Sequence, residues 1–198
     1  MYGKTKAGLG LPVLVDSSGR LIGQDSGKYR EKTLNGNQFF AFCQTQDMAL
    51  YTATAAIGLI VYNPPTSGVN LVWGKWAAQV WATSATATGL VLAISAQIVV
   101  PTSTTTATLT GKTLLTGSTG LVVGKAVAYS VATILVAPVI AWPLFHNTAA
   151  IATTGVDMMN GDLDGVLASA PGTVTVLGAL GAAFVDINVA ICWEEVPV

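Results

Sequence analysis

The feature that most constrains this chain is a long stretch, from Met48 to Val156, without a single acidic residue. Its only basic residues are Lys75, Lys112 and Lys125, and most of the remainder is Ala, Thr, Val, Gly, Leu and Ile. General acid–base catalysis needs ionisable side chains held together in one site, and glycoside hydrolysis needs two carboxylates in one cleft. The stretch therefore predicts the body of a structural module, and we expect neither an enzyme nor a bound cofactor.

The scarcity of charge extends to the whole chain. Only 10% of its 198 residues are charged and 52% are apolar, whereas about 25% are charged in an average soluble domain. Such a chain stays dispersed if uncharged polar residues cover it, as its 24 threonines suggest, or if neighbouring subunits bury its surface. We expect both. The net charge of −1 predicts no binding of nucleic acid and no polybasic contact with a membrane.

Alternation of β-branched and polar residues predicts β-strands along most of the chain. The clearest strand is expected at 183–196, where every second residue from Val185 to Trp193 is apolar. A strand at 50–62 is expected to have one apolar and one more polar face, and 126–142 is expected to hold one long strand or two short ones meeting at Pro138. Many short strands separated by turn residues indicate an all-β fold, an antiparallel β-sandwich, with a jelly roll as one form of it.

Residues 1–37 differ in composition from the predicted sandwich body at 38–198. They contain six of the nine basic residues and seven glycines. A turn at Asp16-Ser17-Ser18-Gly19 between apolar segments predicts a β-hairpin that caps the body, and the alternative is an extended arm that becomes ordered on a partner. The basic residues expected to contact that partner are Lys4, Lys6, Arg20, Lys28 and Arg30.

Tryptophans and cysteines give further candidates. The cluster of Trp73, Trp76 and Trp81 is typical of a core or of a subunit interface, and together with Trp193 we assign it to a self-interface. Cys43 and Cys192 are predicted to be two buried thiols, with a disulfide between the first and last strands as the alternative.

One short motif resembles a calcium loop. Asn160, Asp162 and Asp164 match the first, third and fifth positions of an EF-hand loop, and Gly165 matches the sixth. The twelfth position, which requires a bidentate Glu, is Pro171. Asx residues followed by Gly also form plain turns, so we predict no metal site and keep these three residues as a weak candidate.

Two further ionisable features have plain interpretations. His146 is the only histidine and has no motif of a nucleophile or an orienting carboxylate around it, so it is expected in a loop or interface. Glu194 and Glu195 are adjacent, and in a strand they would point to opposite faces, so they are expected to cap an apolar strand and not to form an acid–base pair.

The carboxyl end carries a resemblance to a known class of proteins. Leu163-Asp164-Gly165-Val166-Leu167 leads through Ala170-Pro171-Gly172-Thr173 to the closing Trp193-Glu194-Glu195-Val196-Pro197-Val198. This is similar to small virion proteins of tailed bacteriophages, which often close on a Trp-Glu-Glu-Val-Pro run after a strand that starts at Pro-Gly. Gly19-Arg20-Leu21-Ile22 and 59–64 are similar too, whereas 157–162 is richer in Met and Asp. The resemblance implies a β-sandwich that assembles as a homotrimer on the capsid exterior or in a fibre.

Two functions follow as expectations. The first is a capsid decoration or cement subunit, made in the host cytoplasm and placed on the virion exterior, whose partners are the major capsid protein and copies of itself. The alternative is a head fibre or receptor-binding module that recognises a host glycan through its Thr-rich loops and tryptophans.

Overall fold

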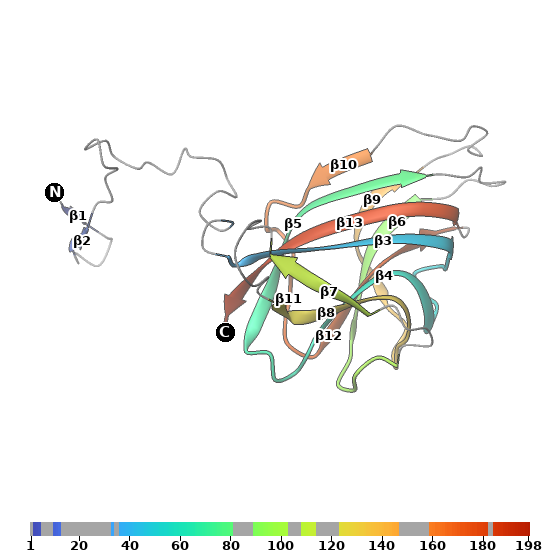
Figure 1. The fold of residues 1–198 in the computed structure, drawn as a ribbon, viewed down its shortest axis with the longest axis horizontal. Coiled ribbons are helices and arrows are strands. Elements are labelled where there is room, and N and C mark those ends of the chain that lie inside the picture. The colour runs from blue at the N-terminus through green and yellow to red at the C-terminus, as the bar shows by residue number, and fades with distance from the viewer. Residues whose placement is uncertain are drawn as a thin grey trace.

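The computed structural model describes residues 2–4, 10–12, 33, 36–80, 89–102, 108–113, 123–146, 159–181 and 184–198. Within these residues the chain forms thirteen β-strands (Figure 1). β1 (Tyr2–Lys4) and β2 (Gly10–Pro12) pair with each other in a separate antiparallel sheet, so Lys4 lies in a strand. The expected hairpin around Asp16–Gly19, and with it Lys6, Arg20, Lys28 and Arg30, lies outside the described residues.

The other strands form the predicted antiparallel β-sandwich (Figure 1). One sheet has the strand order β10 (Met159–Asp162), β5 (Val69–Val80), β13 (Phe184–Pro197) and β3 (Gln38–Met48), with β11 (Ala168–Ser169) also paired to β5. The facing sheet has the order β8 (Val123–Thr133), β4 (Ala55–Asn63), β12 (Thr173–Leu180), β6 (Gly89–Ala96) and β9 (Val139–His146). β7 (Thr108–Thr113) pairs with both β3 and β8 and joins the two sheets.

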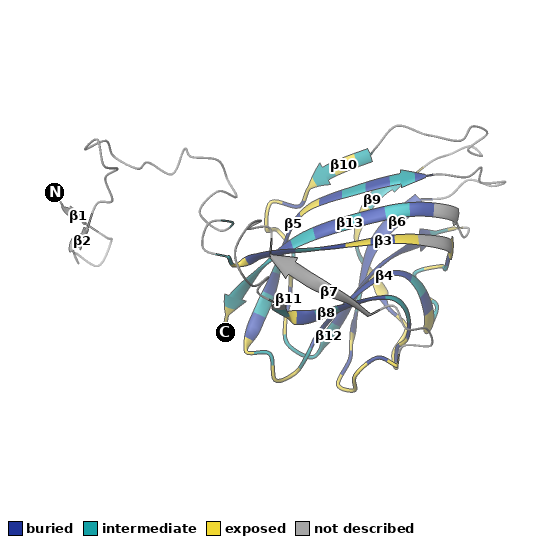
Figure 2. Ribbon diagram, in the orientation of Figure 1, coloured by how far each residue is buried: buried dark blue, intermediate teal, exposed yellow. Residues whose placement is uncertain are grey.

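β13 follows its sequence pattern closely. Ile187, Val189, Ile191 and Trp193 are buried in the main core, whereas the residues between them are partly exposed (Figure 2). β13 pairs with β3 on one side and with β5 on the other. Its apolar face therefore lies in the middle of the sheet and packs against the core. The prediction for this strand is confirmed.

β4 departs from the prediction. It begins at Ala55 and both of its faces are buried beyond Gly58, where φ is 148° and the pairing with β8 shifts register. Leu59 faces the main core, whereas Ile60 and Tyr62 belong to a second cluster with side chains of β8 and β12. The prediction of one more polar face is therefore wrong, because a second small core covers that face of the sheet.

The two sheet edges are irregular. Of the two alternatives for 126–142, the structure has two strands: β8 ends at Thr133 and β9 begins at Val139, directly after Pro138. Pro143 lies inside β9, next to one of two register shifts between β6 and β9. β10, at the opposite edge, has only four residues. Proline, bulges and short length all reduce the ability of an edge strand to pair further.

Tryptophans fill the space between the sheets. Trp73 and Trp193 have no exposed surface, and their ring centroids lie 5.9 Å apart in an edge-to-face arrangement. Phe39 stacks on the other side of Trp193 at 6.3 Å. Trp76, which is 7% exposed, stacks on Phe145 of the facing sheet.

These positions correct the assignment to a self-interface. A side chain that is fully covered by its own chain has no surface left for a second one, so Trp73 and Trp193 are core residues and Trp76 nearly so. Trp81 lies outside the described residues. The Trp73 indole also has an internal partner, because its Nε1–H donates to Ser169 Oγ at 2.8 Å, as a buried indole requires.

Candidate functional site

The calcium-like motif forms a turn. Asn160 and Asp162 lie on β10, paired with Ala77 and Lys75 of β5. The Asp162 Oδ1 accepts the backbone N–H of Asp164 at 2.8 Å, and Asp164 and Gly165 have left-handed φ values of 52° and 70°. This is the geometry of an Asx turn. Among the described residues no group of three or more His, Cys, Asp or Glu side chains could hold a metal ion.

The other ionisable candidates are placed apart from one another. His146 is the exposed last residue of β9, opposite Gly89. The Glu195 carboxylate accepts the backbone N–H groups of Lys125 at 2.9 Å and Ala126 at 3.1 Å. It therefore ties β13 to the start of β8, a role in the fold that alternation alone did not indicate.

The two cysteines are free thiols and lie on opposite faces of their sheet. Cys43 packs in the main core, and burial raises its pKa to about 11. Cys192 is partly exposed and its Sγ accepts the Lys75 N–H at 3.0 Å, where the register between β13 and β5 shifts. Burial also raises the pKa of Cys192 and those of Tyr62 and Tyr129. No disulfide joins the first and last strands of the sandwich.

These raised pKa values predict that the fold weakens at alkaline pH. The folded chain keeps the Cys43 proton up to about pH 11, whereas the unfolded chain loses it near the ordinary thiol value of 9.0. The stabilisation is therefore complete below pH 9.0 and is lost as the pH rises toward 11, with a fall on the order of 2 kcal/mol from this thiol. Urea unfolding at several pH values between 9 and 11 measures the free energy of unfolding. In the Cys43→Ala protein this free energy should fall less steeply with pH. An equally steep fall would contradict the assignment to Cys43.

A patch of exposed apolar side chains covers one end of the second sheet. Within the described residues twelve large apolar side chains are exposed, and eight of them come from the loop after β6, the loop between β8 and β9, and β9 itself. We call these eight the apolar patch: Ile98, Val99, Val100, Leu135, Val136, Val139, Ile140 and Trp142. Each is between 42% and 75% exposed, and exposed apolar side chains gathered on one part of a surface mark a site of interaction.

Specific contacts hold the patch together. The buried Gln97 side chain donates to the Val99 carbonyl at 2.6 Å and accepts the Leu135 N–H at 2.9 Å, so it joins the two loops. Thr102 and Thr133 exchange two backbone hydrogen bonds beside it. Ranges 89–102 and 126–146, which supply the patch, contain no Asp, Glu, Lys or Arg. The surface is thus ordered, apolar and without charge.

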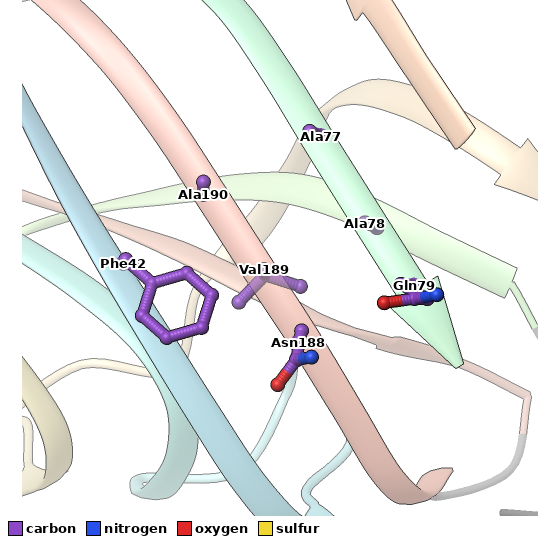
Figure 3. A pocket seen from close by; sticks show the side chains of 7 residues that line it. All are labelled: Phe42, Ala77, Ala78, Gln79, Asn188, Val189 and Ala190. Atoms are coloured by element: carbon purple, nitrogen blue, oxygen red, sulfur yellow. The ribbon is translucent and has the colours of Figure 1, made fainter. Parts of the chain in front are cut away.

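A second surface feature is a shallow hollow on the outer face of the first sheet (Figure 3). It has a volume of about 220 Å³. Phe42 of β3 and Gln79 of β5 lie on either side of β13, and Asn188 lies between them (Figure 3). The other lining residues that the structure describes are Ala77, Ala78, Val189 and Ala190, and none of the described lining residues is ionisable.

The fold and these two surfaces define an all-β sandwich with an apolar patch and an uncharged hollow. Comparison with known proteins gives no counterpart: no protein-family model, no curated protein and no solved structure matches the chain. Among the described residues, none belongs to a helix with the length and hydropathy of a membrane span.

Proposed function

We propose that this protein is a structural subunit of a virion, a decoration or cement protein that binds the exterior of a bacteriophage capsid. It would stabilise the shell by contacts with the major capsid protein and with copies of itself. The proposal needs no catalytic residue and no cofactor; it needs surfaces that adhere. The observation that carries it is the apolar patch, and the resemblance at the carboxyl end supplies the virion setting.

The chemistry of the patch supports contact with a second copy. Specific stable interfaces bury roughly 1,200–2,000 Å² in total, and these eight apolar side chains would supply the apolar part of such an interface between neighbouring copies around one axis. An uncharged apolar surface gains most from a partner of the same kind, because a charged partner would lose hydration without a compensating ion pair. We therefore place the self-interface at the apolar patch and not at the tryptophans.

The basic residues of the N-terminal segment supply the second contact of the proposal. Lys4, Lys6, Arg20, Lys28 and Arg30 would lie on the shell and tie neighbouring capsid subunits together. Many identical weak contacts on one lattice multiply their strength through avidity, so a modest affinity per subunit is sufficient.

Light scattering and truncation test the proposal together. The full chain is expected to elute as a homo-oligomer, a trimer by the resemblance, and a strict monomer at micromolar concentration would contradict the self-contact. Deleting residues 1–30 should leave the body folded, because both core clusters lie between Phe39 and Trp193. The truncated protein should no longer co-sediment with shells of the cognate major capsid protein; binding equal to that of the full chain would contradict the role of the arm.

A further inference from the structure

The hollow on the first sheet is the strongest feature that the adhesive role leaves unused. It lies on the outer face of β3, β13 and β5, whereas the apolar patch belongs to the loops and edge of the second sheet. The two surfaces share no residue. A ligand in the hollow would therefore be compatible with assembly through the patch.

Strand register builds the hollow from residues far apart in the chain. One row across the sheet is Phe42, Ala190 and Ala77, directly opposite one another on the three strands. The next row is Gln44, Asn188 and Gln79. Two alanines beside a phenylalanine leave an opening, and side-chain amides border it.

The chemistry of the lining selects a neutral ligand with both apolar and hydroxyl groups. Phe42 is 49% exposed and offers an aromatic surface. The amide groups of Gln44, Asn188 and Gln79 lie in one row beside it, and amides both donate to and accept from hydroxyl groups. In Figure 3 the nitrogen of the Asn188 amide lies on the side of Gln79 and its oxygen on the side away from Gln79. None of the lining residues that the structure describes could neutralise a charged ligand.

We propose that the hollow is a binding subsite for a neutral sugar ring. The apolar C–H face of a pyranose would lie against the Phe42 ring, and ring hydroxyls would exchange hydrogen bonds with the side-chain amides of Gln44 and Gln79. The volume of about 220 Å³ lies below the roughly 300–1,000 Å³ of sites for drug-sized ligands. One ring, as an exposed unit of a neutral polysaccharide, fits this size, and we expect millimolar affinity.

Saturation-transfer NMR with small glycosides tests the subsite in the full chain. Methyl β-glucopyranoside and methyl N-acetyl-β-glucosaminide should bind, and methyl β-glucuronide, which adds a carboxylate to the same ring, should bind at least tenfold more weakly. Equal binding of the glucuronide, or no binding of either neutral glycoside at millimolar concentration, would overturn the proposal.

Two variants place the binding in the hollow. Phe42→Ala removes the aromatic surface, and Ala190→Leu fills the opening while every amide stays; each should weaken the neutral glycosides at least tenfold in a protein with an unchanged circular dichroism spectrum. Unchanged affinity in the folded Ala190→Leu protein would overturn the assignment.

A matched control separates this proposal from the adhesive role. Leu135→Lys lies in the apolar patch and should weaken self-association but leave glycoside binding unchanged. If Leu135→Lys abolished glycoside binding in a folded protein, the sugar would bind at the patch and the hollow would not be the site.

Discussion

Replacing Trp193 with alanine is expected to destabilise the fold by about 3–5 kcal/mol, the usual cost of removing a large aromatic side chain from a core. Trp193 has no exposed surface and contacts Trp73 on one side and Phe39 on the other. It also lies on the strand that pairs with both β3 and β5. Since a whole domain has about 5–15 kcal/mol of stability, this one change removes a large share. Thermal unfolding should show a fall in Tm of about 6–20 °C.

Phe42→Ala is the matched control for this prediction. It truncates another aromatic residue of the same sheet, but one that is 49% exposed, so its cost should be about 1 kcal/mol. Equal losses for Trp193→Ala and Phe42→Ala would mean that the space between the sheets is not filled as described. A larger loss for Phe42→Ala would contradict the position of the core itself.

Placing lysines in the apolar patch is expected to weaken self-association by two orders of magnitude or more. Leu135→Lys with Val139→Lys would bring unpaired ammonium groups into the covered interface, and each such buried charge costs about 2–5 kcal/mol, where about 1.4 kcal/mol is tenfold. Both side chains are more than 60% exposed in the single chain, so the stability of the monomer should change by less than about 0.5 kcal/mol. Sedimentation equilibrium measures the change in association.

Val166→Lys provides the control for this experiment. Val166 is 71% exposed, close to the 69% of Val139, but lies in the turn after β10, outside the patch. It should leave association unchanged. Equal weakening by Val166→Lys would show that added net charge, and not the position of the charge, is responsible.

Much of the sandwich could be predicted from local pattern. β13 has an apolar residue at every second position because one face meets the core, and Pro138 marked the break between β8 and β9 because proline has no N–H to donate. β4 could not be read in this way. Ile60 and Tyr62 pack in a second cluster with residues of β8 and β12, so the strand is apolar on both faces and its polar face disappears.

The surfaces could be predicted much less well. A tryptophan in a core and one in an interface have the same sequence signature, and only the pairing of β5 with β13 places Trp73 beside Trp193. The apolar patch could not be predicted from the sequence, because its residues have the composition of a core strand. Leu135, Val136, Val139 and Ile140 flank Pro138 and are exposed in the structure. The hollow depends on a register that brings Phe42, Ala77 and Ala190 together, and no local pattern encodes that register.

The irregular edges of the sheets limit how copies of this chain can accumulate. Pro143 and two register shifts interrupt β9, and β10 has four residues. Neither border offers a long unbroken row of backbone N–H and C=O groups that a second molecule could extend. The edges therefore disfavour growth of fibrils by strand addition, although the low charge of the chain gives little electrostatic repulsion between copies. Copies of this chain would therefore associate through side-chain surfaces and not by adding strands to a sheet.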